Sequence, residues 1–166
     1  MTERIYHTET GNLLLIAVDD RLVYCNWESP ACHKKLINIK RLYASPPGPC
    51  EETVITNAVN QLDEYFQGKR SEFQLPLAFH GTSFQIKVWM AIASIPYGDV
   101  TTYSDIAEKI GKDKAARALA QACGANPLAI ILPCHRVVSK NGEGGYTGGI
   151  EKKRKLLALE KSIKKF

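Results

Sequence analysis

A cysteine followed directly by a histidine is the part of the sequence best equipped for chemistry. Cys134 and His135 follow Pro133 and lie behind the apolar run 128–132. Proline restricts the backbone ahead of the thiol, and a neighbouring imidazole favours the thiolate, which is the form of cysteine that attacks. The arrangement therefore predicts a nucleophilic cysteine held on a buried platform.

The other cysteines show no comparable pattern. The chain has five cysteines, an odd number, and no Cys-x-x-Cys pair. We therefore predict reduced thiols rather than a disulfide framework or a zinc site. The pair Cys32-His33 lacks the surroundings of Cys134 and is interpreted as a chance pairing. Metal binding is not expected at Cys25, Cys32, His33 or His80.

The composition is that of an ordinary globular protein. Of the 166 residues, 45% are hydrophobic and 23% are charged, and no apolar run is long enough to cross a membrane. The first seven residues hold no apolar signal core, so we expect a soluble, monomeric protein of the cytoplasm, or of the nucleus in a eukaryote. The net charge of +5 suits a polyanionic partner. Much of it lies at 152–155 and 161–165, interpreted as a solvated helix face and a frayed tail.

The first half, residues 1–80, has the patterns of a small domain of sheet and helix. Two apolar, β-prone runs are separated by a pair of aspartates, which is typical of an antiparallel hairpin. A proline-rich loop follows, and after it apolar residues recur at helical spacing until a glycine ends the pattern. The expected elements are strands 12–18 and 21–27 around Asp19-Asp20, a loop at 45–49, a helix carrying Val54, Ala58, Leu62 and Phe66 and ended by Gly68, and a further strand at 73–77.

The second half, residues 81–166, is expected to be mostly helical and to contain a helix-turn-helix. A capping box opens its first helix, and later two short helices follow each other across a three-residue turn that contains a glycine. The expected elements are a helix opened by the box at 82–85, a helix 103–110 capped by Thr102, a turn at Gly111 and a helix 114–123 capped by Asp113, so that the helix-turn-helix covers about 103–123.

The second helix of this pair has one polar, basic face. Lys114, Arg117 and Gln121 lie at i, i+3 and i+7, whereas Leu119 and Cys123 are expected to face inward. Five alanines fill the rest of the helix, and helix packing explains them as well as close approach to a DNA duplex does. Small side chains carry few groups that read base edges, so the second explanation predicts docking that ignores sequence and suits the minor groove.

Several short motifs occur together and in order: Tyr65-Phe66-Gln67-Gly68, Gly81-Thr82-Ser83-Phe84-Gln85 with Val88-Trp89, Ile95-Pro96-Tyr97-Gly98, Thr102-Tyr103, Ala115-Ala116-Arg117-Ala118, Asn126-Pro127, Pro133-Cys134-His135-Arg136-Val137-Val138, Tyr146-Thr147-Gly148-Gly149 and Leu156-Leu157-Ala158-Leu159-Glu160. From residue 62 onward the chain thus resembles the O6-alkylguanine-DNA alkyltransferase family, the methylated-DNA–protein-cysteine methyltransferases. The resemblance implies an α/β (α+β) fold, with a small domain resembling ribonuclease H ahead of the helical domain.

The resemblance implies single-turnover, irreversible transfer of the alkyl group of O6-alkylguanine, and of O4-alkylthymine, in duplex DNA to Cys134. His135 would act on this thiol through a water, and Glu160 would orient His135. Tyr103 would donate a hydrogen bond or a proton to the departing base. The product is a thioether with no carbonyl for water to attack, so each molecule would act once. Neither a cofactor nor a metal is implied.

A carbon inside stacked DNA is out of reach of a fixed thiol, so the alkylated nucleotide would have to leave the helix. By resemblance, Arg117 would fill the gap in the stack, with Lys114 and Gln121 beside it on the DNA-facing helix. Asn126 would brace the turn before the nucleophile. The base pocket would be walled by Tyr146, Thr147 and Gly148, and the backbone around Val137 would hold the amino group of the base.

The chain departs from the usual family pattern at Leu132, Ala129 and Ala120, where isoleucine, proline and glycine are more common. The methyl group of Ala120 affects how closely this helix packs or docks, so the sequence does not determine the affinity for DNA. Two alternatives remain at this point. One is a helix-turn-helix DNA-binding module or alkylation sensor in which Cys134 is merely buried, and methyl transfer to Cys134 would exclude it. The other is a cysteine hydrolase, which would turn over repeatedly.

Overall fold

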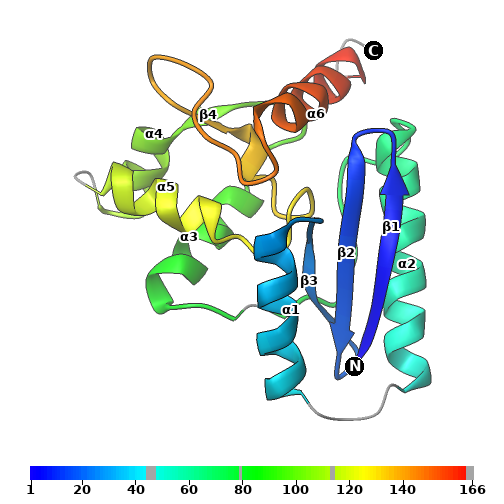
Figure 1. Cartoon of the computed structure of the whole chain (residues 1–166). Helices are drawn as coiled ribbons and strands as arrows, with labels where there is room; N and C mark the ends of the chain where they lie inside the picture. The colour runs from blue at the N-terminus through cyan, green and yellow to red at the C-terminus, as the bar shows by residue number, and fades with distance from the viewer. Residues whose placement is uncertain (44–47, 79, 113–114, 164–166) are drawn as a thin grey trace. The chain divides into compact units, whose positions relative to one another are not determined.

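The computed structural model describes the chain except for residues 44–47, 79, 113–114 and 164–166 (Figure 1). An antiparallel sheet with two helices comes first, and a mostly helical part follows. The mixed α/β class predicted from the sequence is therefore confirmed. No helix in the described part of the chain is long and apolar enough to span a membrane.

A three-stranded antiparallel sheet forms the centre of the first of two compact units, Met1–Phe79. Its strands are β1 (Thr2–Thr8), β2 (Gly11–Val18) and β3 (Arg21–Trp27), in that spatial order. The predicted hairpin is confirmed, since the aspartates between β2 and β3 have φ angles of 47° and 60°, which a two-residue hairpin turn of type I′ requires. No residue of β1 is fully buried, so this strand has no apolar pattern by which to predict it.

α2 (Pro49–Phe66) covers one face of the sheet. Val54, Ala58 and Leu62 are buried at the predicted helical spacing, whereas Phe66 is half-buried, and the helix packs against all three strands. The helix ends as predicted, since Gly68 follows it with a φ of 72°, a conformation that suits glycine. Pro49 is the first helical residue, where proline is well tolerated, and residues 45–47 of the expected loop lie outside the described part. The buried residues of α2 are Glu51, Val54, Ile55, Ala58, Leu62 and Tyr65.

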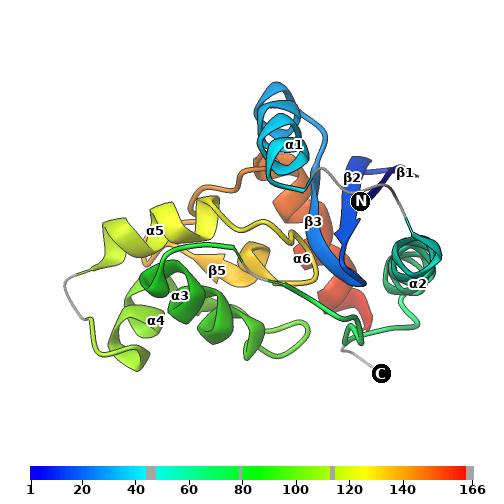
Figure 2. The same ribbon diagram turned by 90° about the horizontal axis from the view of Figure 1, so that it is seen from below.

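α1 (Pro30–Leu42) lies on the opposite face of the sheet from α2, as Figure 2 shows, and was absent from the sequence prediction. Ser29 caps its first turn, because the hydroxyl accepts a hydrogen bond from the backbone amide of Cys32 at 3.1 Å. The helix packs on the sheet through Cys32, Leu36 and Ile39. So short an apolar stripe does not distinguish a helix from a loop in the sequence.

The strand expected at 73–77 is wrong. Leu77 alone forms an isolated parallel bridge, with Leu22 as its partner. The Leu22 amide donates to the Pro76 carbonyl at 2.8 Å, and the Ala78 amide donates to the Leu22 carbonyl at 3.1 Å. Proline has no N–H group to donate, so the pairing does not extend into a strand through this segment.

The second unit, His80–Phe166, is built from helices around one short parallel strand pair. Thr82 and Thr102 cap the first two helices, as the sequence predicted. Both caps are capping boxes, of which only the one at Thr82 was predicted. The elements are α3 (Ser83–Ala93), β4 (Thr101–Thr102), α4 (Tyr103–Lys109), α5 (Ala116–Gly124), the 3-10 turn η1 (Cys134–Arg136), β5 (Val137–Val138) and α6 (Ile150–Ile163).

α4 and α5 pack against each other across a turn at Gly111, whose φ is 69°. α5 begins at Ala116, two residues later than predicted, and both Lys114 and the expected cap Asp113 lie outside the described residues. Leu119 and Cys123 are buried, as their side of the helix predicted. The indole N–H of Trp89 on α3 donates to the Ala122 carbonyl at 2.9 Å. This hydrogen bond holds the C-terminal end of α5 against α3.

Candidate active site

Cys134 begins η1 at the end of a buried segment. Residues 128–137 are all buried, and only 6% of Cys134 is exposed. The Cys134 amide donates to the Leu132 carbonyl at 2.8 Å, and the Arg136 amide donates to the Pro133 carbonyl at 2.9 Å. These bonds fix the backbone on both sides of the thiol, so the buried setting predicted from the apolar run is observed.

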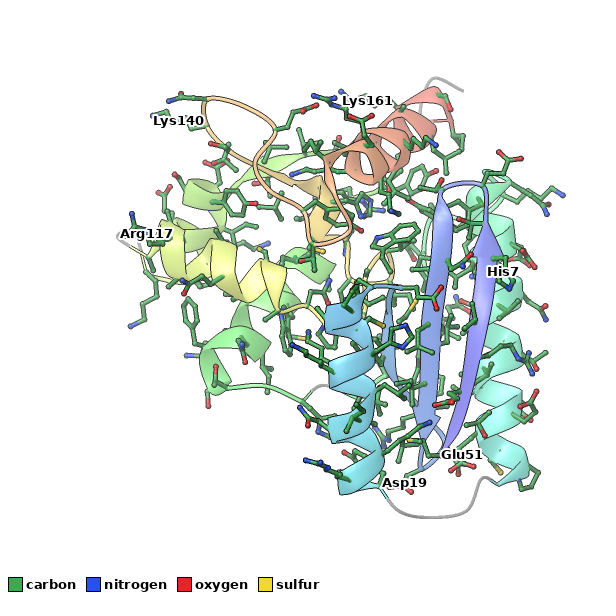
Figure 3. All side chains as sticks on the ribbon, in the orientation of Figure 1. His7, Asp19, Glu51, Arg117, Lys140 and Lys161 are labelled. Atoms are coloured by element: carbon green, nitrogen blue, oxygen red, sulfur yellow. The ribbon has the colours of Figure 1, made fainter. Side chains whose placement is uncertain are left out.

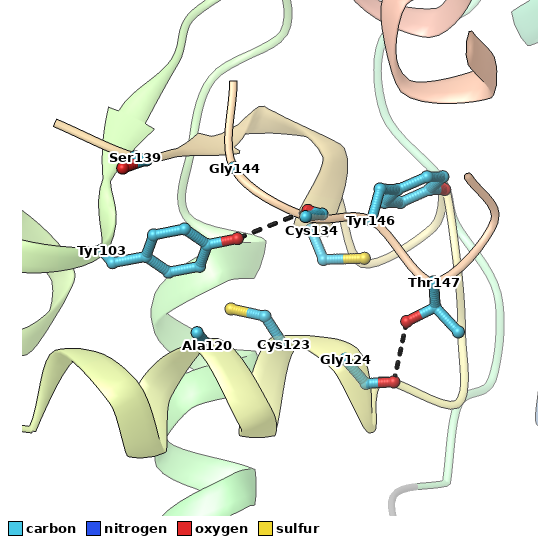
Figure 4. Close-up of a pocket in the computed structure, with 10 residues that line it drawn as sticks. Tyr103, Ala120, Cys123, Gly124, Cys134, Ser139, Gly144, Tyr146 and Thr147 are labelled. Atoms are coloured by element: carbon cyan, nitrogen blue, oxygen red, sulfur yellow. Dashed lines mark hydrogen bonds between the residues drawn. The ribbon is translucent and has the colours of Figure 1, made fainter. Parts of the chain in front are cut away.

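The thiol opens into a pocket of about 460 Å³ (Figure 4). The start of α4, one side of α5 and the loop 139–147 form its walls. Tyr146 and Thr147 line it, whereas Gly148 does not. The Thr147 hydroxyl donates to the Gly124 carbonyl at 2.9 Å and so ties the loop to the end of α5. The lining residues are Tyr103, Ala120, Cys123, Gly124, Cys134, Ser139, Gly144, Gly145, Tyr146 and Thr147.

Asn126 joins the end of α5 to the thiol. Its side-chain N–H group donates to the Leu132 carbonyl at 2.8 Å and to Cys134 Sγ at 3.1 Å, and its oxygen accepts from the Leu128 amide at 2.9 Å. Burial raises the pKa of the Cys134 thiol, and the hydrogen bond from Asn126 is the strongest of the opposing effects. The residue expected to brace the turn therefore also contacts the sulfur.

Ile130 lies at the apex of the turn that Asn126 braces. Its φ is 72° and its side chain is buried. A β-branched residue rarely adopts this left-handed conformation, which costs on the order of 1–3 kcal/mol and persists only where the surroundings enforce it. The three hydrogen bonds of Asn126 provide that constraint.

His135 and Glu160 form a fully buried pair, with His135 Nε2 2.7 Å from Glu160 Oε1. Burial alone would raise the pKa of Glu160, but hydrogen bonds from His135 and Arg136 lower it to about 2. Burial lowers the pKa of His135, so the imidazole is neutral. A carboxylate only accepts hydrogen bonds, hence Nε2 carries the proton and Nδ1 has a free lone pair. Nδ1 has no hydrogen-bond partner among the described residues.

Arg136 completes this buried group, although the sequence analysis gave it no role. Its Nε donates to Glu160 Oε2 at 2.9 Å, its Nη2 to Glu160 Oε1 at 3.0 Å and its Nη1 to the Ile95 carbonyl at 2.7 Å. The Gly98 amide also donates to Glu160 Oε2, at 3.0 Å. Four donors thus hold one carboxylate. An arginine inside an apolar run was the sequence signal for such a pairing, because arginine is rarely buried without a partner.

Lys153 corrects the interpretation of 152–155 as a solvated helix face. Its side chain is fully buried, and Nζ donates to the carbonyls of Val137 at 2.7 Å, Gly145 at 3.4 Å and Glu143. It therefore fixes the loop that walls the pocket, and it engages the backbone carbonyl at Val137. The signal was its spacing on α6, because 153, 156 and 160 share one helix face.

Tyr103 is the first residue of α4 and lines the pocket on the side opposite Cys134 (Figure 4). Its hydroxyl donates to the Gly145 carbonyl at 3.4 Å. Burial, reinforced by Cys123 and Cys134, raises the pKa of Tyr103 to about 12, so the phenol keeps its proton. Gly144 packs against the ring, where an added Cβ would lie 3.0 Å from the nearest ring carbon.

Two of the residues predicted to face DNA, Arg117 and Gln121, are not among those that line the pocket. Arg117 and Gln121 are exposed on α5, and Figure 3 shows Arg117 projecting at the beginning of the helix. The side of α5 that faces the pocket instead presents Ala120, Cys123 and Gly124. One helix thus offers a polar outer surface and a wall of the pocket.

Two family models cover nearly the whole chain. The 6-O-methylguanine DNA methyltransferase ribonuclease-like domain matches residues 1–79, and the DNA-binding domain of the same family matches residues 83–162. The chain is also similar over its length to a solved structure, Mycobacterium tuberculosis OGT in complex with DNA. The two chains are 39% identical and superpose with a TM-score of 0.81 over 97% of this chain and 93% of the other.

Curated relatives agree with these matches. A methylated-DNA–protein-cysteine methyltransferase of Methanosarcina acetivorans is 40% identical over 95% of this chain and 97% of its own length. A probable enzyme of that name from Acanthamoeba polyphaga mimivirus is 56% identical over 64% of this chain and 72% of the relative. The alignment with a Mycobacterium tuberculosis enzyme, 52% identical, covers 64% of this chain and just 66% of that protein. The chain therefore belongs to the 6-O-methylguanine DNA methyltransferase family, the methylated-DNA–protein-cysteine methyltransferases of DNA repair.

Proposed function

We propose that the protein removes the alkyl group from O6-alkylguanine, and from O4-alkylthymine, in double-stranded DNA by transferring it to Cys134, once per molecule and irreversibly. The observation that carries this proposal is the pocket-facing thiol of Cys134, hydrogen-bonded by Asn126 and followed by the buried pair of His135 and Glu160. The transfer is carried out by the domain 81–166, and the domain 1–80 supports it.

The thiol rests in its neutral form, because burial raises its pKa. Attack therefore needs a base at the moment of reaction. Neutral His135 offers the lone pair of Nδ1, and Glu160 fixes this tautomer by accepting from Nε2. The proton of Cys134 passes through a bridging water to Nδ1. The hydrogen bond from Asn126 then stabilises the charge on the sulfur.

The thiolate attacks the saturated carbon attached to O6 of the guanine. The new bond joins Sγ to that carbon, the bond between carbon and O6 breaks, and its electron pair stays on the base. Tyr103 keeps its proton at neutral pH, so it donates to the base ring as negative charge develops there. The base takes up the phenol proton, and the proton that His135 received from the thiol restores the phenol through solvent. The products are an uncharged guanine and a thioether, and no cofactor or metal takes part.

The alkylated nucleotide reaches this pocket by rotating out of the duplex, which costs about a few kcal/mol. Arg117 extends from α5 and fills the space left in the stack, while Gln121 and Lys114 contact the duplex beside it. Ala120 and Gly124 allow the backbone of α5 to approach the base. Tyr146 and Thr147 enclose the base, with Gly148 and the backbone around Val137 behind them. A protein with this role acts where the genome lies, in the cytoplasm or, in a eukaryote, the nucleus.

The test is intact mass and peptide mapping after mixing the protein with duplex DNA that contains O6-methylguanine. One added methyl group on Cys134, with the damaged duplex only, is expected. Unmodified duplex and a Cys134→Ala variant are the controls. Binding of damaged DNA with no change in mass would overturn the proposal and favour a DNA-binding module.

A second arm separates chemistry from DNA binding. Arg117→Ala is expected to slow transfer from duplex DNA, because the extruded nucleotide loses the side chain that replaces it in the stack. The same variant should react normally with free O6-methylguanine base, which needs no extrusion. Lys87→Ala, a change at an exposed lysine on α3, is the matched control. Equal slowing with the free base would place Arg117 in the folding of the site instead.

A further inference from the structure

A second thiol shares the pocket with Cys134. Cys123 lies on α5, 6% exposed, and lines the same cavity. The reaction proposed above gives it no role, since one sulfur accepts the alkyl group. Both are free thiols. Two cysteines at one cavity have a chemistry that a single cysteine lacks, because each can capture an oxidised form of the other.

Asn126 holds the two cysteines near each other. Its backbone amide donates to the Cys123 carbonyl at 3.2 Å, and its side chain donates to Cys134 Sγ at 3.1 Å. In Figure 4 the Cys123 sulfur is turned toward Tyr103, and the Cys134 sulfur is turned the opposite way, toward Tyr146. The thiols are therefore unbonded in this form, and a bond between them requires rotation about their Cα–Cβ bonds inside the pocket.

We propose that Cys123 and Cys134 form a reversible disulfide, with hydrogen peroxide as the oxidant and a small-molecule thiol as the reductant. In the first step the Cys134 thiolate attacks one peroxide oxygen, giving a sulfenic acid, and the other oxygen leaves as hydroxide and takes up the proton released by the thiol to form water. In the second step the Cys123 sulfur displaces the sulfenic hydroxyl, which leaves with the Cys123 proton as a second water. Two thiols and one peroxide thus give one disulfide and two waters.

The surroundings of the two thiols determine their order of reaction. Burial, aided by the nearby Cys134, raises the pKa of Cys123 to about 12. Cys134 has the hydrogen bond from Asn126 and the imidazole of His135 as its next residue, so it forms the thiolate first. Cys123 then resolves the sulfenic acid. The ammonium group of Lys153 acts on both sulfurs and favours their anionic forms.

The consequence is protection of a thiol that acts only once. An unpaired sulfenic acid proceeds to sulfinic acid, which a simple thiol does not reduce. The disulfide stops this path, blocks entry of a base into the pocket and joins α5 covalently to the nucleophile segment. Reduction restores the acceptor. The inference rests on the proposed function only for the activity that is silenced, because the disulfide itself forms without DNA.

The test treats the reduced protein with hydrogen peroxide and maps its peptides without reduction. For the wild type we expect the mass to fall by two hydrogens, a peptide linking Cys123 to Cys134, loss of methyl acceptance, and recovery with dithiothreitol. Cys123→Ser and Cys123→Ala should instead give sulfinic acid at Cys134 and little recovery relative to their own untreated activity. Cys50→Ser, a change at an exposed cysteine, should behave as the wild type. Protein methylated beforehand should form no disulfide.

Two outcomes would overturn the proposal. The first is a wild type whose Cys134 becomes sulfinic acid as fast as in the Cys123 variants. The second is a linked peptide that joins Cys134 to a different cysteine. Peptide mapping of the wild type shows whether Cys123 and Cys134 are linked, even where a variant folds poorly. Absence of methyl transfer by the untreated protein, with the disulfide present, would contradict the proposed function alone.

Discussion

Two buried cysteines, one in each unit, differ in what surrounds them. Cys25 on β3 is fully buried, and burial together with the neighbouring Cys32 raises its pKa to about 12. Burial also raises the pKa of Cys134, but Asn126, the local backbone and Lys153 all act in the opposite direction. Enclosure alone therefore makes an unreactive thiol, and the polar groups around Cys134 keep a thiolate within reach of a base.

The same contrast holds for the two cores. In the first unit the described buried polar residues are Asn26 and Glu51, and the core is otherwise apolar. In the second unit the buried polar groups gather beside the pocket: Asn126, His135, Arg136, Lys153 and Glu160. Burying charge costs several kcal/mol per ion before pairing offsets it. The second unit carries that cost beside Cys134, the proposed nucleophile, whereas the first unit has no such cluster among its described residues.

The strongest test of this comparison removes each sulfur in turn. Cys134→Ala should abolish methyl transfer, because no other group receives the alkyl carbon. Cys25→Ala should lower the free energy of unfolding by about 1 kcal/mol and leave transfer per folded molecule intact. Methyl incorporation from damaged duplex and denaturant unfolding measure the two effects. Methyl transfer by Cys134→Ala would show that another group accepts the alkyl carbon and that the polar surroundings of Cys134 do not select the acceptor.

Glu160→Gln should have the next largest effect. The neutral amide no longer places a negative charge beside His135, and the buried guanidinium of Arg136 loses its carboxylate partner while keeping the Ile95 carbonyl. Loss of the charged partner costs about 3–5 kcal/mol of stability. Transfer should slow by about 10²–10⁴-fold, the usual contribution of general base catalysis. Single-turnover kinetics and thermal unfolding give both values. Glu151→Gln on the same helix is the matched control, because that residue is exposed and its ion pair with Arg154 is worth little.

The acid stability of the protein tests the same carboxylate. Glu160 has a pKa of about 2 in the fold against an ordinary value of 4.5. Because the pKa of Glu160 is lower in the folded protein than in the unfolded chain, the ionised carboxylate stabilises the fold at pH values above 4.5. This contribution is lost as the pH falls from 4.5 toward 2. The free energy of unfolding should decline more steeply across that window in the wild type than in Glu160→Gln, because other carboxylates with lowered pKa values, such as Glu143, contribute in both proteins. An equally steep decline in the variant would assign it to other carboxylates.

Variants at two buried asparagines, Asn126 and Asn26, distinguish two roles of Asn126: bracing the turn before Cys134 and activating the thiol. Asn126→Ala leaves the Leu128 amide without a partner, at about 1–3 kcal/mol. It also removes one of the two donors to the Leu132 carbonyl and the donor to Cys134 Sγ. Transfer should slow about tenfold for each unit by which the pKa of the thiol rises. Asn26→Ala breaks the bond that the Trp27 amide donates to Asn26, so it should cost stability but not the rate per folded molecule. Equal rates in the two variants would mean that Asn126 only braces the turn.

Periodicity and caps predicted most of the fold. The hairpin around Asp19 and the capped helices at Thr82 and Thr102 follow from local chemistry, which the sequence carries within a few residues. β1 was missed because it has no buried face of its own. The false strand at 73–77 has an apolar pattern without the amide donors that a ladder needs.

The sequence singles out residues of the candidate site, but it does not reveal their contacts. Cys134, His135 and Glu160 stand out by residue type and motif. Arg136 lies far from Glu160 along the chain, so the sequence does not show that it is the second partner of that carboxylate. Lys153 was placed on a solvated face because a run of basic residues is usually exposed. Only the packing of α6 shows which lysine of the run points inward.

Lys153 also gives the smallest predicted effect, and a direct one on the thiol. Its charge lowers the pKa of Cys134, and its Nζ binds the carbonyls that position the loop at Val137 and Gly145. Transfer in the wild type should rise with pH, because the raised pKa of the thiol leaves little thiolate at neutrality. Lys153→Met should move this pH–rate profile to higher pH, since the thiolate loses a nearby positive charge. Lys155→Met, at an exposed position, should leave the profile in place. A uniform loss of rate at every pH in Lys153→Met would show that the lysine acts through the loop alone, and the polar surroundings of Cys134 would then reduce to Asn126 and the backbone.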